Sequence, residues 1–303
     1  MQILENEPMC KHTSFKVGGA ARYYMKAECL KDIQGAIALA REKGLPYFIL
    51  GNGTNLLVSD KGYTGVVITL AGEFSEIQDL GNGTFKVGSA TPLGRFARNA
   101  MKLGFAGIHK LAGIPGTLGG AIYMNAGAYG QEIGTCCKAV TVLESDGNTR
   151  EYTASECGFG YRRSAFQENK AIILAATFQL PAAATESKTV ADLEAELAEC
   201  MAKRKASQPL NMPNAGSTFK RLETGAADTP TQIAPGYYIE QAGLKGYRIG
   251  GAEVSTVHAN FIVNAGGATA SDIKQLSEFV QQKVAEKFGI QLHREIILLG
   301  EFE

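Results

Sequence analysis

The sequence predicts an α+β fold, because patterns typical of helices and of strands alternate along its 303 residues. Apolar residues recur every three or four positions over 30–40 and over 273–284, which indicates amphipathic helices. A continuous apolar run over 171–180 indicates a buried strand. A stretch rich in Ala, Thr and Ser over 181–188 interrupts the pattern, and a second, smaller α+β part begins at about Ser207.

Glycine, proline and capping residues indicate where each element begins and ends. Thr91 has the character of an N-cap with Pro92 at the first helical position, and Asp146-Gly147-Asn148 is typical of a hairpin turn. In the first half we expect a helix over 30–40 that ends at Gly44, strands over 47–50, 66–70 and 84–87, a helix from Thr91 to Gly104, a hairpin of 140–143 with 150–153, and a strand over 171–180. Beyond it we expect a helix over 190–205, strands over 217–221 and 261–263, a helix through 273–284 that ends at Gly289, and a strand over 295–299.

Composition excludes several classes of protein. Thirty basic and thirty acidic residues give a formal net charge of zero, so the chain is not a strongly basic nucleic-acid binder. Charged residues make up 20% and hydrophobic residues 45%, which argues against disorder. The apolar run over 171–178 is far shorter than the roughly 20 residues that span a bilayer, so we expect no membrane insertion. No basic segment followed by an apolar run opens the sequence, and we expect a cytoplasmic protein.

The six cysteines and four histidines show no spacing typical of a zinc or iron–sulfur site. There is no C-x-x-C pair, and the cysteines are scattered along the chain. We therefore expect free thiols and no metal site.

Two glycine-rich clusters are candidates for binding a ligand. The first comprises Gly51, Asn52, Gly53, Thr54 and Asn55, directly after a buried strand. Short residues here expose backbone N–H groups, and such a nest suits a phosphate or pyrophosphate. It is not the G-x-G-x-x-G dinucleotide fingerprint, because Leu56 occupies the sixth position. An ordinary turn explains this cluster equally well.

The second cluster has four glycines within the eight residues 113–120. So many glycines cost folding entropy that a plain connection does not require. The residues that follow, 123–130, are mostly small, and a planar ring could lie against their backbone. A ligand site is favoured over a ligand-free turn, although the turn remains the alternative.

Several longer phrases resemble one known family. They are Thr13 to Ala20, Leu50 to Val58, Leu111 to Gly130, Gly158 to Phe166, Asn214 to Lys220 and Gly243 to Ala252. In this order they resemble the UDP-N-acetylenolpyruvoylglucosamine reductase (MurB) family of flavoproteins. The short stretch between Leu180 and Lys205 is similar to the family's compact subtype, which lacks a tyrosine loop. The likeness covers nearly the whole chain, and it is the combination of phrases that makes it specific.

The resemblance implies a two-lobed FAD-binding domain of the vanillyl-alcohol-oxidase type and a smaller α+β C-terminal domain. We expect the first FAD-binding lobe over 1–61, the second lobe with a connecting helix over 62–206, and the substrate-binding domain over 207–303. FAD would be bound non-covalently, and NADPH would be the co-substrate. The positions that match the family's cofactor site are Gly51, Asn52, Gly53, Thr54, Asn55, Gly113, Ile114, Pro115, Gly116, Thr117, Gly119, Gly120, Asn125 and Gly127.

Arg162, Ser217 and Glu295 match the family's catalytic motifs. Reduction of an enolpyruvyl ether adds hydride to the methylene carbon and a proton to the neighbouring carbon, through an enolate-like intermediate. A cation at Arg162 would stabilise the developing negative charge, and the Ser217 hydroxyl would donate the proton. Glu295 would hold Arg162 or a water. Without the resemblance, these residues would be interpreted as a surface ion pair, a strand hydroxyl and a solvated charge.

Four further positions are candidates for binding the substrate: Lys205, Tyr129, Lys220 and Arg221. Lys205 matches the family's nucleotide-phosphate lysine, although a cation favoured by the dipole at a helix C-terminus explains it equally well. Tyr129 would reach the sugar nucleotide or simply pack as an aromatic. Lys220 or Arg221 would stabilise the Ser217 alkoxide, and the sequence does not choose between them. We expect His258 to order a turn.

The resemblance therefore implies an NADPH-dependent flavoenzyme that converts UDP-N-acetylglucosamine enolpyruvate to UDP-N-acetylmuramate in peptidoglycan precursor synthesis. Its partners would be the sugar-nucleotide substrate and NADPH, with no nucleic acid, and we expect a monomer. Two other interpretations stay open: an oxidase of the same flavin fold, and a sugar-nucleotide-binding module that has lost flavin chemistry.

Overall fold

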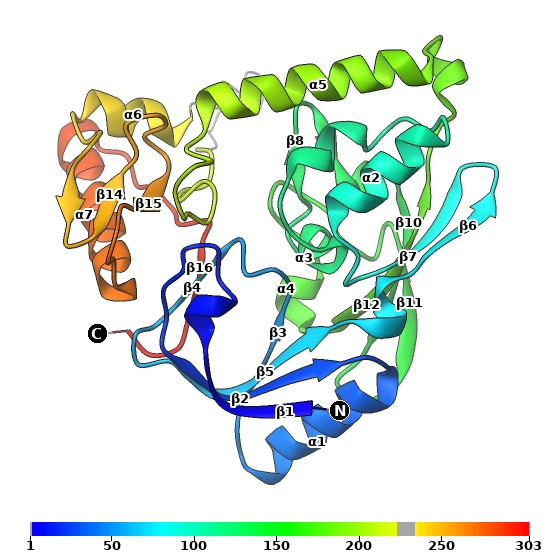
Figure 1. Ribbon diagram of the computed structural model, residues 1–303, viewed down its shortest axis with the longest axis horizontal. Helices are drawn as coiled ribbons and strands as arrows, with labels where there is room; N and C mark the ends of the chain where they lie inside the picture. Colours follow the sequence, from blue (N-terminus) through cyan, green and yellow to red (C-terminus); the bar gives the residue numbers. More distant parts are fainter. Residues whose placement is uncertain (1, 223–233, 303) are drawn as a thin grey trace. The chain divides into compact units, whose positions relative to one another are not determined.

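The computed structural model describes residues 2–222 and 234–302 (Figure 1). Helices and strands alternate along the chain, so the predicted α+β class is confirmed. The chain forms two compact units, and each is assembled from three stretches. The first unit combines Met1–Leu4, Tyr24–Asn52 and Val66–Arg204, and the second unit combines Glu5–Tyr23, Gly53–Gly65 and Lys205–Glu303.

The main sheet of the first unit has five antiparallel strands. Their spatial order is β11 (Thr149–Thr153), β10 (Cys137–Leu143), β12 (Ile172–Gln179), β7 (Thr84–Gly88) and β6 (Ile77–Gly81). β10 and β11 form the predicted hairpin, in which Leu143 pairs with Thr149 and Gly147 adopts φ +89°. The apolar run predicted as a buried strand is β12, which lies at the centre of the sheet.

Helices α2 (Leu93–Lys102) and α3 (Leu118–Tyr123) contribute to the same hydrophobic core as this sheet. Phe96 from α2 packs against Phe178 of β12, with ring centroids 5.1 Å apart, and against Phe85 of β7 at 5.8 Å. These rings are fully buried. The core therefore fixes the chain segments that run between the sheet and the two helices.

A four-stranded sheet has the order β1 (Gln2–Pro8), β2 (Ala20–Ala27), β5 (Tyr63–Leu70) and β3 (Tyr47–Leu50). Helix α1 (Leu30–Glu42) connects β2 to β3, and Gly44 follows it at φ +62°, as predicted. Strands β1, β2 and β5 each have residues in both units. Other elements of the first unit are β8 (Gly127–Ala128), β9 (Gln131–Glu132), α4 (Phe166–Asn169), α5 (Val190–Ser207, its last residues in the second unit) and the 3₁₀ turns η2 (Gly72–Ser75), η3 (His109–Gly113), η4 (Ile133–Thr135) and η5 (Ala183–Glu186).

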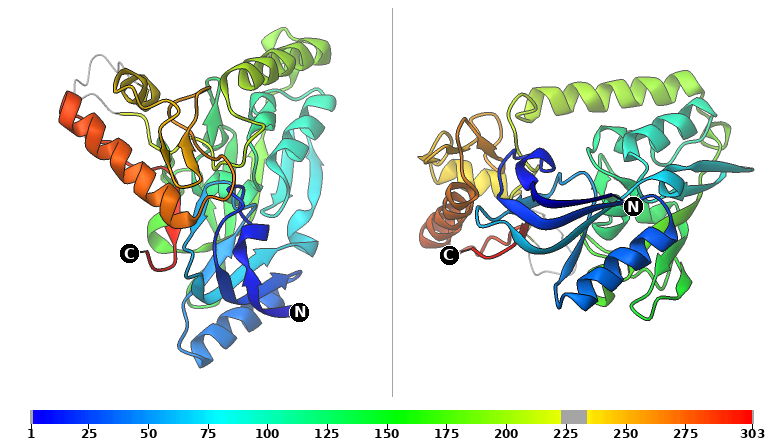
Figure 2. Two further views of the ribbon diagram at one scale, coloured as in Figure 1. Left: turned by 60° about the vertical axis from the view of Figure 1, so that its left-hand side comes forward. Right: turned by 60° about the horizontal axis from the view of Figure 1, so that its bottom comes forward.

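In the second unit, helix α7 (Ala270–Phe288) packs on a three-stranded sheet, as Figure 2 shows. The strands are β13 (Arg248–Ile249), β14 (Ala252–Val254) and β15 (Ile262–Asn264). Both oxygens of the Asp60 carboxylate accept the first N–H groups of α7, from Ala270 and Ser271, each at 2.8 Å. Beside this layer stand η1 (Met9–Lys11), helix α6 (Pro235–Gln241) and the parallel pair of β4 (Leu56–Val58) with β16 (Ile297–Leu299).

Two local predictions are wrong. Pro92, not Thr91, is the N-cap of α2, since the Pro92 carbonyl oxygen accepts from Arg95 and Phe96 and its ψ of 126° is not helical. Thr91 instead belongs to the preceding turn, where its N–H donates to the Gly88 oxygen. The segment 217–221 is not a regular strand: the chain bends at Thr218, and Phe219 forms only an isolated bridge with Arg294. The physical reason for the second difference lies in the side-chain contacts described below.

Among the described residues, no helix combines the length and the apolar character that crossing a membrane requires. All six cysteines are free.

Candidate active site

The glycine-rich segment 113–120 of the first unit is bonded to the turn that follows β7. Leu118 N–H donates to the Thr91 oxygen and Gly119 N–H to the Ser89 oxygen, both at 2.8 Å. In the opposite direction, Leu93 N–H donates to the Gly116 oxygen at 3.1 Å. These bonds place the segment directly against the start of α2.

Close approach explains several of the glycines. A Cβ at Gly51 would lie 2.7 Å from Thr117 Oγ1, and a Cβ at Gly119 would lie 3.0 Å from Ser89 Cβ. Gly116 adopts φ +137°, which side-chain-bearing residues rarely adopt. The first contact shows that the two glycine-rich clusters, about 60 positions apart in the sequence, meet in the first unit at Gly51 and Thr117.

Two buried hydroxyl groups beside this segment lack hydrogen-bond partners. Within residues 2–222 and 234–302, only four buried side-chain polar atoms lack one, and Ser89 Oγ and Thr91 Oγ1 are two of them. Because burying an unpaired hydroxyl is costly, such a pair makes this turn a candidate for binding a ligand. The hydroxyls and the closely packed glycine backbone suit the phosphate oxygens of FAD. Sequence reasoning missed both residues, although the Ser-Ala-Thr phrase after a strand was a signal.

Asn125 holds the loops near Arg162. Its side chain, 2% exposed, donates to the Gly160 oxygen at 2.9 Å and to Glu132 at 3.1 Å, and its Oδ1 accepts Gly134 N–H at 3.0 Å. All three contacts are internal to the protein. Asn125 thus supports the segment that leads to Arg162.

Arg162 itself adopts φ +52°, a left-handed conformation that is uncommon outside glycine. Its guanidinium donates to the Gly127 oxygen at 3.3 Å and lies over the Tyr161 ring, 5.0 Å from the centroid. Gln167 fixes the backbone by donating to the Arg162 oxygen at 3.1 Å. Strain of this kind is often found at functional sites, where the surroundings determine one conformation.

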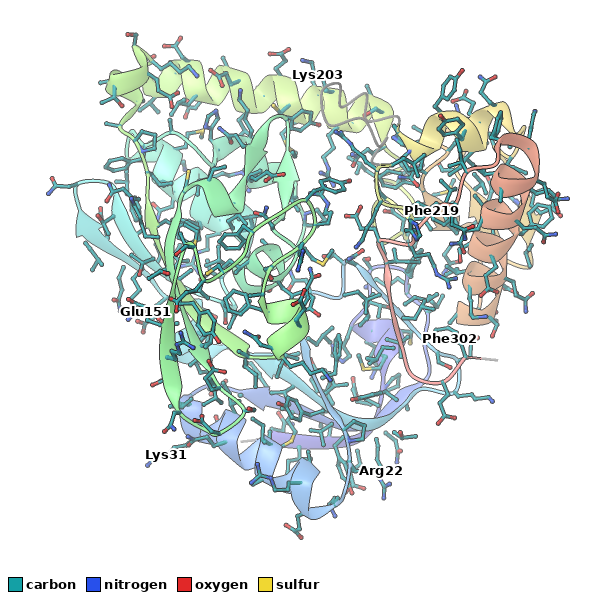
Figure 3. The ribbon with its side chains drawn as sticks, turned by 180° about the vertical axis from the view of Figure 1, so that it is seen from behind. Arg22, Lys31, Glu151, Lys203, Phe219 and Phe302 are labelled. Atoms are coloured by element: carbon teal, nitrogen blue, oxygen red, sulfur yellow. The ribbon has the colours of Figure 1, made fainter. Side chains whose placement is uncertain are left out.

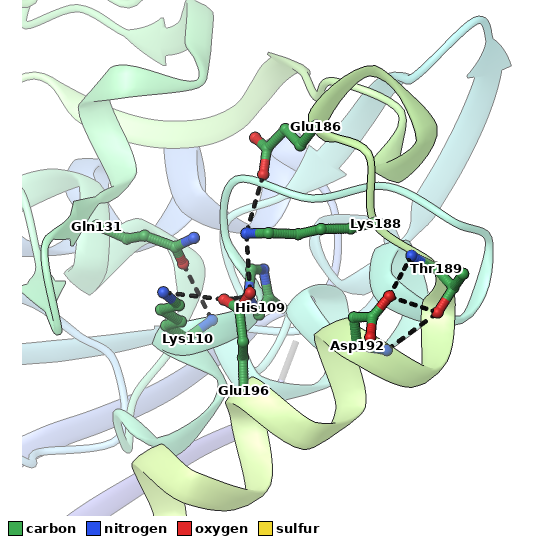
Figure 4. Close-up of polar contacts among 8 residues, drawn as sticks. All are labelled: His109, Lys110, Gln131, Glu186, Lys188, Thr189, Asp192 and Glu196. Carbon is green, nitrogen blue, oxygen red and sulfur yellow. Dashed lines mark hydrogen bonds and ion pairs between the residues drawn. The ribbon is translucent and has the colours of Figure 1, made fainter.

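Four ionisable side chains connect η3, the turn that leads into the glycine-rich segment, to α5 and the residues before it (Figure 4). The Glu196 carboxylate on α5 contacts Lys188 at 2.8 Å, Lys110 at 2.9 Å and His109 Nε2 at 3.1 Å. We call His109, Lys110, Lys188 and Glu196 the Glu196 network. Hydrogen bonds from Lys188, Lys110 and His109, in that order, lower the pKa of Glu196 to about 2.

His109 is the buried member of the network, with 1% of its side chain exposed. Burial lowers the pKa of His109, although its hydrogen bond to Glu196 acts in the opposite direction. The ring is therefore neutral at neutral pH. It carries its proton on Nε2, because a carboxylate can only accept.

Further along α5, a Cβ at Gly113 would lie 2.9 Å from Met201 Sδ. Helix α5 thus fixes the glycine-rich segment at its first residue as well as through the Glu196 network. Both contacts lie within the first unit.

In the second unit, the segment 217–220 lies between two other stretches of backbone. On one side Thr218 N–H donates to the Asn260 oxygen at 2.7 Å. On the other, Glu295 N–H donates to the Thr218 oxygen and Lys220 N–H to the His293 oxygen, both at 2.8 Å. The structure therefore brings the segment that carries Ser217 beside the segment that carries Glu295.

Asn55 belongs to the same assembly. Its side-chain amide donates to the Glu295 oxygen at 3.1 Å, and Ile297 N–H donates to the Asn55 oxygen at 3.0 Å. Gly53 is buried against residue 12, where a Cβ would lie 2.1 Å from the His12 oxygen. The second half of the first glycine-rich cluster is thus fixed to the Glu295 segment.

The other predicted site residues are distributed over both units. Tyr129 is 40% exposed in the first unit at φ +52°, and Pro115 and Gly120 are exposed. In the second unit Lys205 and Arg221 are exposed, whereas Lys220 is half-buried. His258 orders a turn, as expected, because its Nδ1 accepts Asn260 N–H at 3.1 Å. Among the described residues, no group of three or more His, Cys, Asp or Glu could hold a metal ion.

Comparison with known proteins assigns both parts of the chain. Residues 21–153 match an FAD binding domain, and residues 208–299 match the C-terminal domain of UDP-N-acetylenolpyruvoylglucosamine reductase. These matches confirm the predicted FAD-binding part and C-terminal part.

The chain is also similar to whole proteins of this kind. It is 41% identical over 300 residues to UDP-N-acetylenolpyruvoylglucosamine reductase of Heliobacterium modesticaldum, covering 99% of this chain and 91% of the relative. The enzyme of the same name from Clostridium botulinum is 42% identical over 301 residues, covering 99% and 93%.

Among solved structures, the reductase MurB from Thermus caldophilus superposes with a TM-score of 0.79 at 34% identity, covering 99% of this chain and 98% of that one. Sequence and structure agree over essentially the full length. The chain belongs to the UDP-N-acetylenolpyruvoylglucosamine reductase (MurB) family.

Proposed function

We propose that this protein reduces UDP-N-acetylglucosamine enolpyruvate to UDP-N-acetylmuramate with NADPH and non-covalently bound FAD. The observation that carries the proposal is the likeness over nearly the whole chain to relatives named UDP-N-acetylenolpyruvoylglucosamine reductase. Bound FAD would take hydride from NADPH and pass it to the methylene carbon of the substrate. The chain's own residues would bind the cofactor and the substrate and supply the proton.

The glycine-rich segment and the hydroxyls beside it would hold the FAD pyrophosphate. The close contact of Gly51 with Thr117 and the unpartnered Ser89 and Thr91 hydroxyls support this role. To the predicted cofactor residues we therefore add Ser89 and Thr91.

Arg162 would stabilise the negative charge that spreads into the substrate carboxylate during reduction. A fixed cation stabilises such charge because it needs no reorganisation during the reaction. The left-handed backbone of Arg162 and its contacts with Gly127 and Tyr161 support a preset position.

Ser217 would donate the proton to the carbon next to the one that receives hydride. The resulting alkoxide would be stabilised by Lys220 or Arg221 and regain a proton from water. Glu295 would hold Arg162 or a water, as the family resemblance implies. Lys205 and Tyr129 would bind the sugar nucleotide.

We propose residues 1–61 and 62–206 as the FAD-binding lobes and residues 207–303 as the substrate-binding domain. We further propose that the enzyme is a monomer. We also propose that it is cytoplasmic, because the cytoplasm would supply both NADPH and the sugar nucleotide.

The absorption spectrum of the purified protein tests the proposal first. We expect a flavin spectrum that NADPH bleaches under anaerobic conditions and that UDP-N-acetylglucosamine enolpyruvate restores, with formation of a product two mass units heavier. Acid precipitation should release the yellow flavin into the supernatant. Stoichiometric peroxide formation with an alcohol would indicate an oxidase instead, and a colourless protein would indicate a binding module.

A further inference from the structure

We propose that Asn260 is a positioning residue that fixes Ser217 for proton donation and sets its segment in register with Glu295. The inference rests on the proposed function, because it assumes that Ser217 is the proton donor. Asn260 itself would not touch the substrate. It acts through the backbone of residues 218 and 219.

The side-chain amide of Asn260 is committed to one residue of the Ser217 segment. Phe219 N–H donates to Asn260 Oδ1 at 3.1 Å, and Asn260 Nδ2 donates to the Phe219 oxygen at 2.9 Å. The pair reproduces the two bonds that a neighbouring strand would make with Phe219, which is labelled in Figure 3. Asn260 is 5% exposed and Phe219 1%, so water competes little for these bonds.

Two further bonds complete what we call the Asn260 clamp. The main-chain oxygen of Asn260 accepts Thr218 N–H at 2.7 Å, and the buried Thr218 Oγ1 accepts Ile262 N–H at 3.2 Å. Side chains thus replace ladder bonds on this side, which is why the segment 217–221 is not a regular strand. His258 secures the clamp by accepting Asn260 N–H.

The opposite side of the same segment is bonded to the residues around Glu295. Because the Thr218 oxygen accepts Glu295 N–H, the residue directly after Ser217 is bonded to Glu295. Before Ser217, Gly216 turns at φ +76° and its N–H donates to Asn214 Oδ1 at 2.9 Å. Ser217 is therefore the residue between a fixed turn and a fixed segment.

Only a planar group with one donor and one acceptor can make both bonds to Phe219. Alanine at 260 would leave the buried N–H and C=O of Phe219 unpaired, and the segment would shift to reach other partners. A displacement of about 1 Å at a reacting group can cost about 100-fold in rate. Proton donation by Ser217 should therefore suffer while cofactor reduction does not.

The first test is Asn260→Ala followed by anaerobic stopped-flow of each half-reaction. We expect reduction by NADPH to stay within twofold of wild type, and reoxidation by the enolpyruvyl substrate to slow by about 10- to 100-fold. Flavin content and melting temperature are measured alongside. A variant that folds and keeps its reoxidation rate within twofold would overturn the proposal.

The second test, Asn260→Asp, remains decisive where the alanine variant does not fold. A protonated carboxyl can accept from Phe219 N–H and donate to the Phe219 oxygen, whereas a carboxylate would face that oxygen with like charge. Burial raises the pKa of such a carboxyl. We expect the ratio of variant to wild-type reoxidation rates to fall by about tenfold or more from pH 6 to pH 9. The reason is that the ionised side chain at position 260 would no longer hold Ser217 in place for proton donation.

Other titratable groups near this position occur in both proteins, so their effects cancel in the ratio. These groups are His258, Glu240, Lys245, His293, Arg294 and Glu295. A flat ratio equal to one over this range would contradict the proposal.

Asn264→Asp is the matched control. Its side chain also donates to a backbone oxygen, that of Phe15 at 3.1 Å, and accepts the N–H groups of Gly266 and Ala268. We expect it to change the melting temperature but not the ratio of the two half-reactions. An equal loss in Asn264→Asp and Asn260→Asp would overturn the proposal.

Ser217→Ala, measured in the same series, separates the two proposals. If Ser217→Ala reoxidises normally, the proposed proton donor is wrong. If Ser217→Ala is slow and the Asn260 variants are not, the donor stands and the positioning role is wrong.

Discussion

The two units hold their candidate functional segments by opposite means. In the first unit, the Glu196 network braces the glycine-rich segment with four ionisable side chains. In the second, the Asn260 clamp holds the Ser217 segment with an amide, a hydroxyl and backbone groups. Ion pairs respond to pH and salt, whereas an amide has no titration. The residue that we propose as the proton donor is thus held by contacts whose geometry does not depend on pH.

The largest effect is expected where the first unit would hold the cofactor. Gly116→Val should abolish flavin binding, because φ +137° is a conformation that a β-branched residue resists and the segment would be displaced. Flavin absorbance per folded protein measures the loss. Gly81→Val is the control, because Gly81 also has a positive φ (+85°) but no atom lies within 4 Å of its would-be Cβ. Full flavin content in Gly116→Val would remove this segment from the cofactor site.

Arg162→Gln tests the charge contribution of the first unit. Loss of one preset group that stabilises transition-state charge costs about 100- to 1,000-fold, and we expect this loss in reoxidation by the substrate. The adjacent Arg163→Gln is the control, since Arg163 is exposed and pairs with Glu168 at 2.8 Å. Comparable losses in both variants would mean that Arg162 has no special role.

Local signals predicted much of the fold and only part of the candidate site. Gly44, Gly289 and the turn at Gly147 end their elements as predicted, because a positive φ is a property of one residue. Pro92 was misplaced by one position, since its fixed φ suits both the N-cap and the first helical position.

The missed residues depend on partners that are distant in the sequence. Asn260 bonds to a residue 41 positions earlier, and no local pattern reports such a pairing. The Ser-Ala-Thr phrase was a weak signal for Ser89 and Thr91, and only the coordinates show that their hydroxyls are buried without partners. The family resemblance made Ser217 and Glu295 candidates but could not show that two backbone bonds join their segments.

A smaller effect is expected when the Glu196 network is broken. Glu196→Gln should lower the melting temperature by several degrees at pH 7, because it leaves Lys110 and Lys188 without a counter-charge and weakens the hydrogen bond from His109. The stabilisation by Glu196 is fully present above its unfolded pKa and is lost as pH falls toward its folded pKa of about 2. In a series of melting temperatures against pH, the difference between wild type and variant should therefore begin to shrink at about pH 4.5, the pKa of the group in the unfolded chain.

The lowered pKa of His109 acts in the same direction. Between its ordinary value and the lowered one, the unfolded chain binds more protons, so wild type should begin to lose stability as pH falls through about 6.5. Glu199→Gln is the control on the same helix, since Glu199 is exposed and its pair with Lys203 contributes little. Equal melting shifts in Glu196→Gln and Glu199→Gln would show that the network is not a brace.

The smallest effect is expected at the start of α5. Thr189 Oγ1 accepts Asp192 N–H at 3.2 Å while the Asp192 carboxylate accepts Thr189 N–H at 2.8 Å. Thr189→Ala should cost about 1 kcal/mol and lower the melting temperature by about 2–4 °C. Flavin content should not change. A loss of flavin would mean that the start of α5 contributes more to cofactor binding than the Glu196 network does.

The most direct test of the contrast between the units is Ser217→Ala, followed through both half-reactions by anaerobic stopped-flow absorbance. Reduction by NADPH transfers no proton to carbon, so it should proceed at near wild-type rate with full flavin content. Reoxidation by the enolpyruvyl substrate should slow by about 100- to 10,000-fold, the range of general-acid catalysis. Equal slowing of both halves would make Ser217 a structural residue, and an unaffected second half would contradict its role as proton donor.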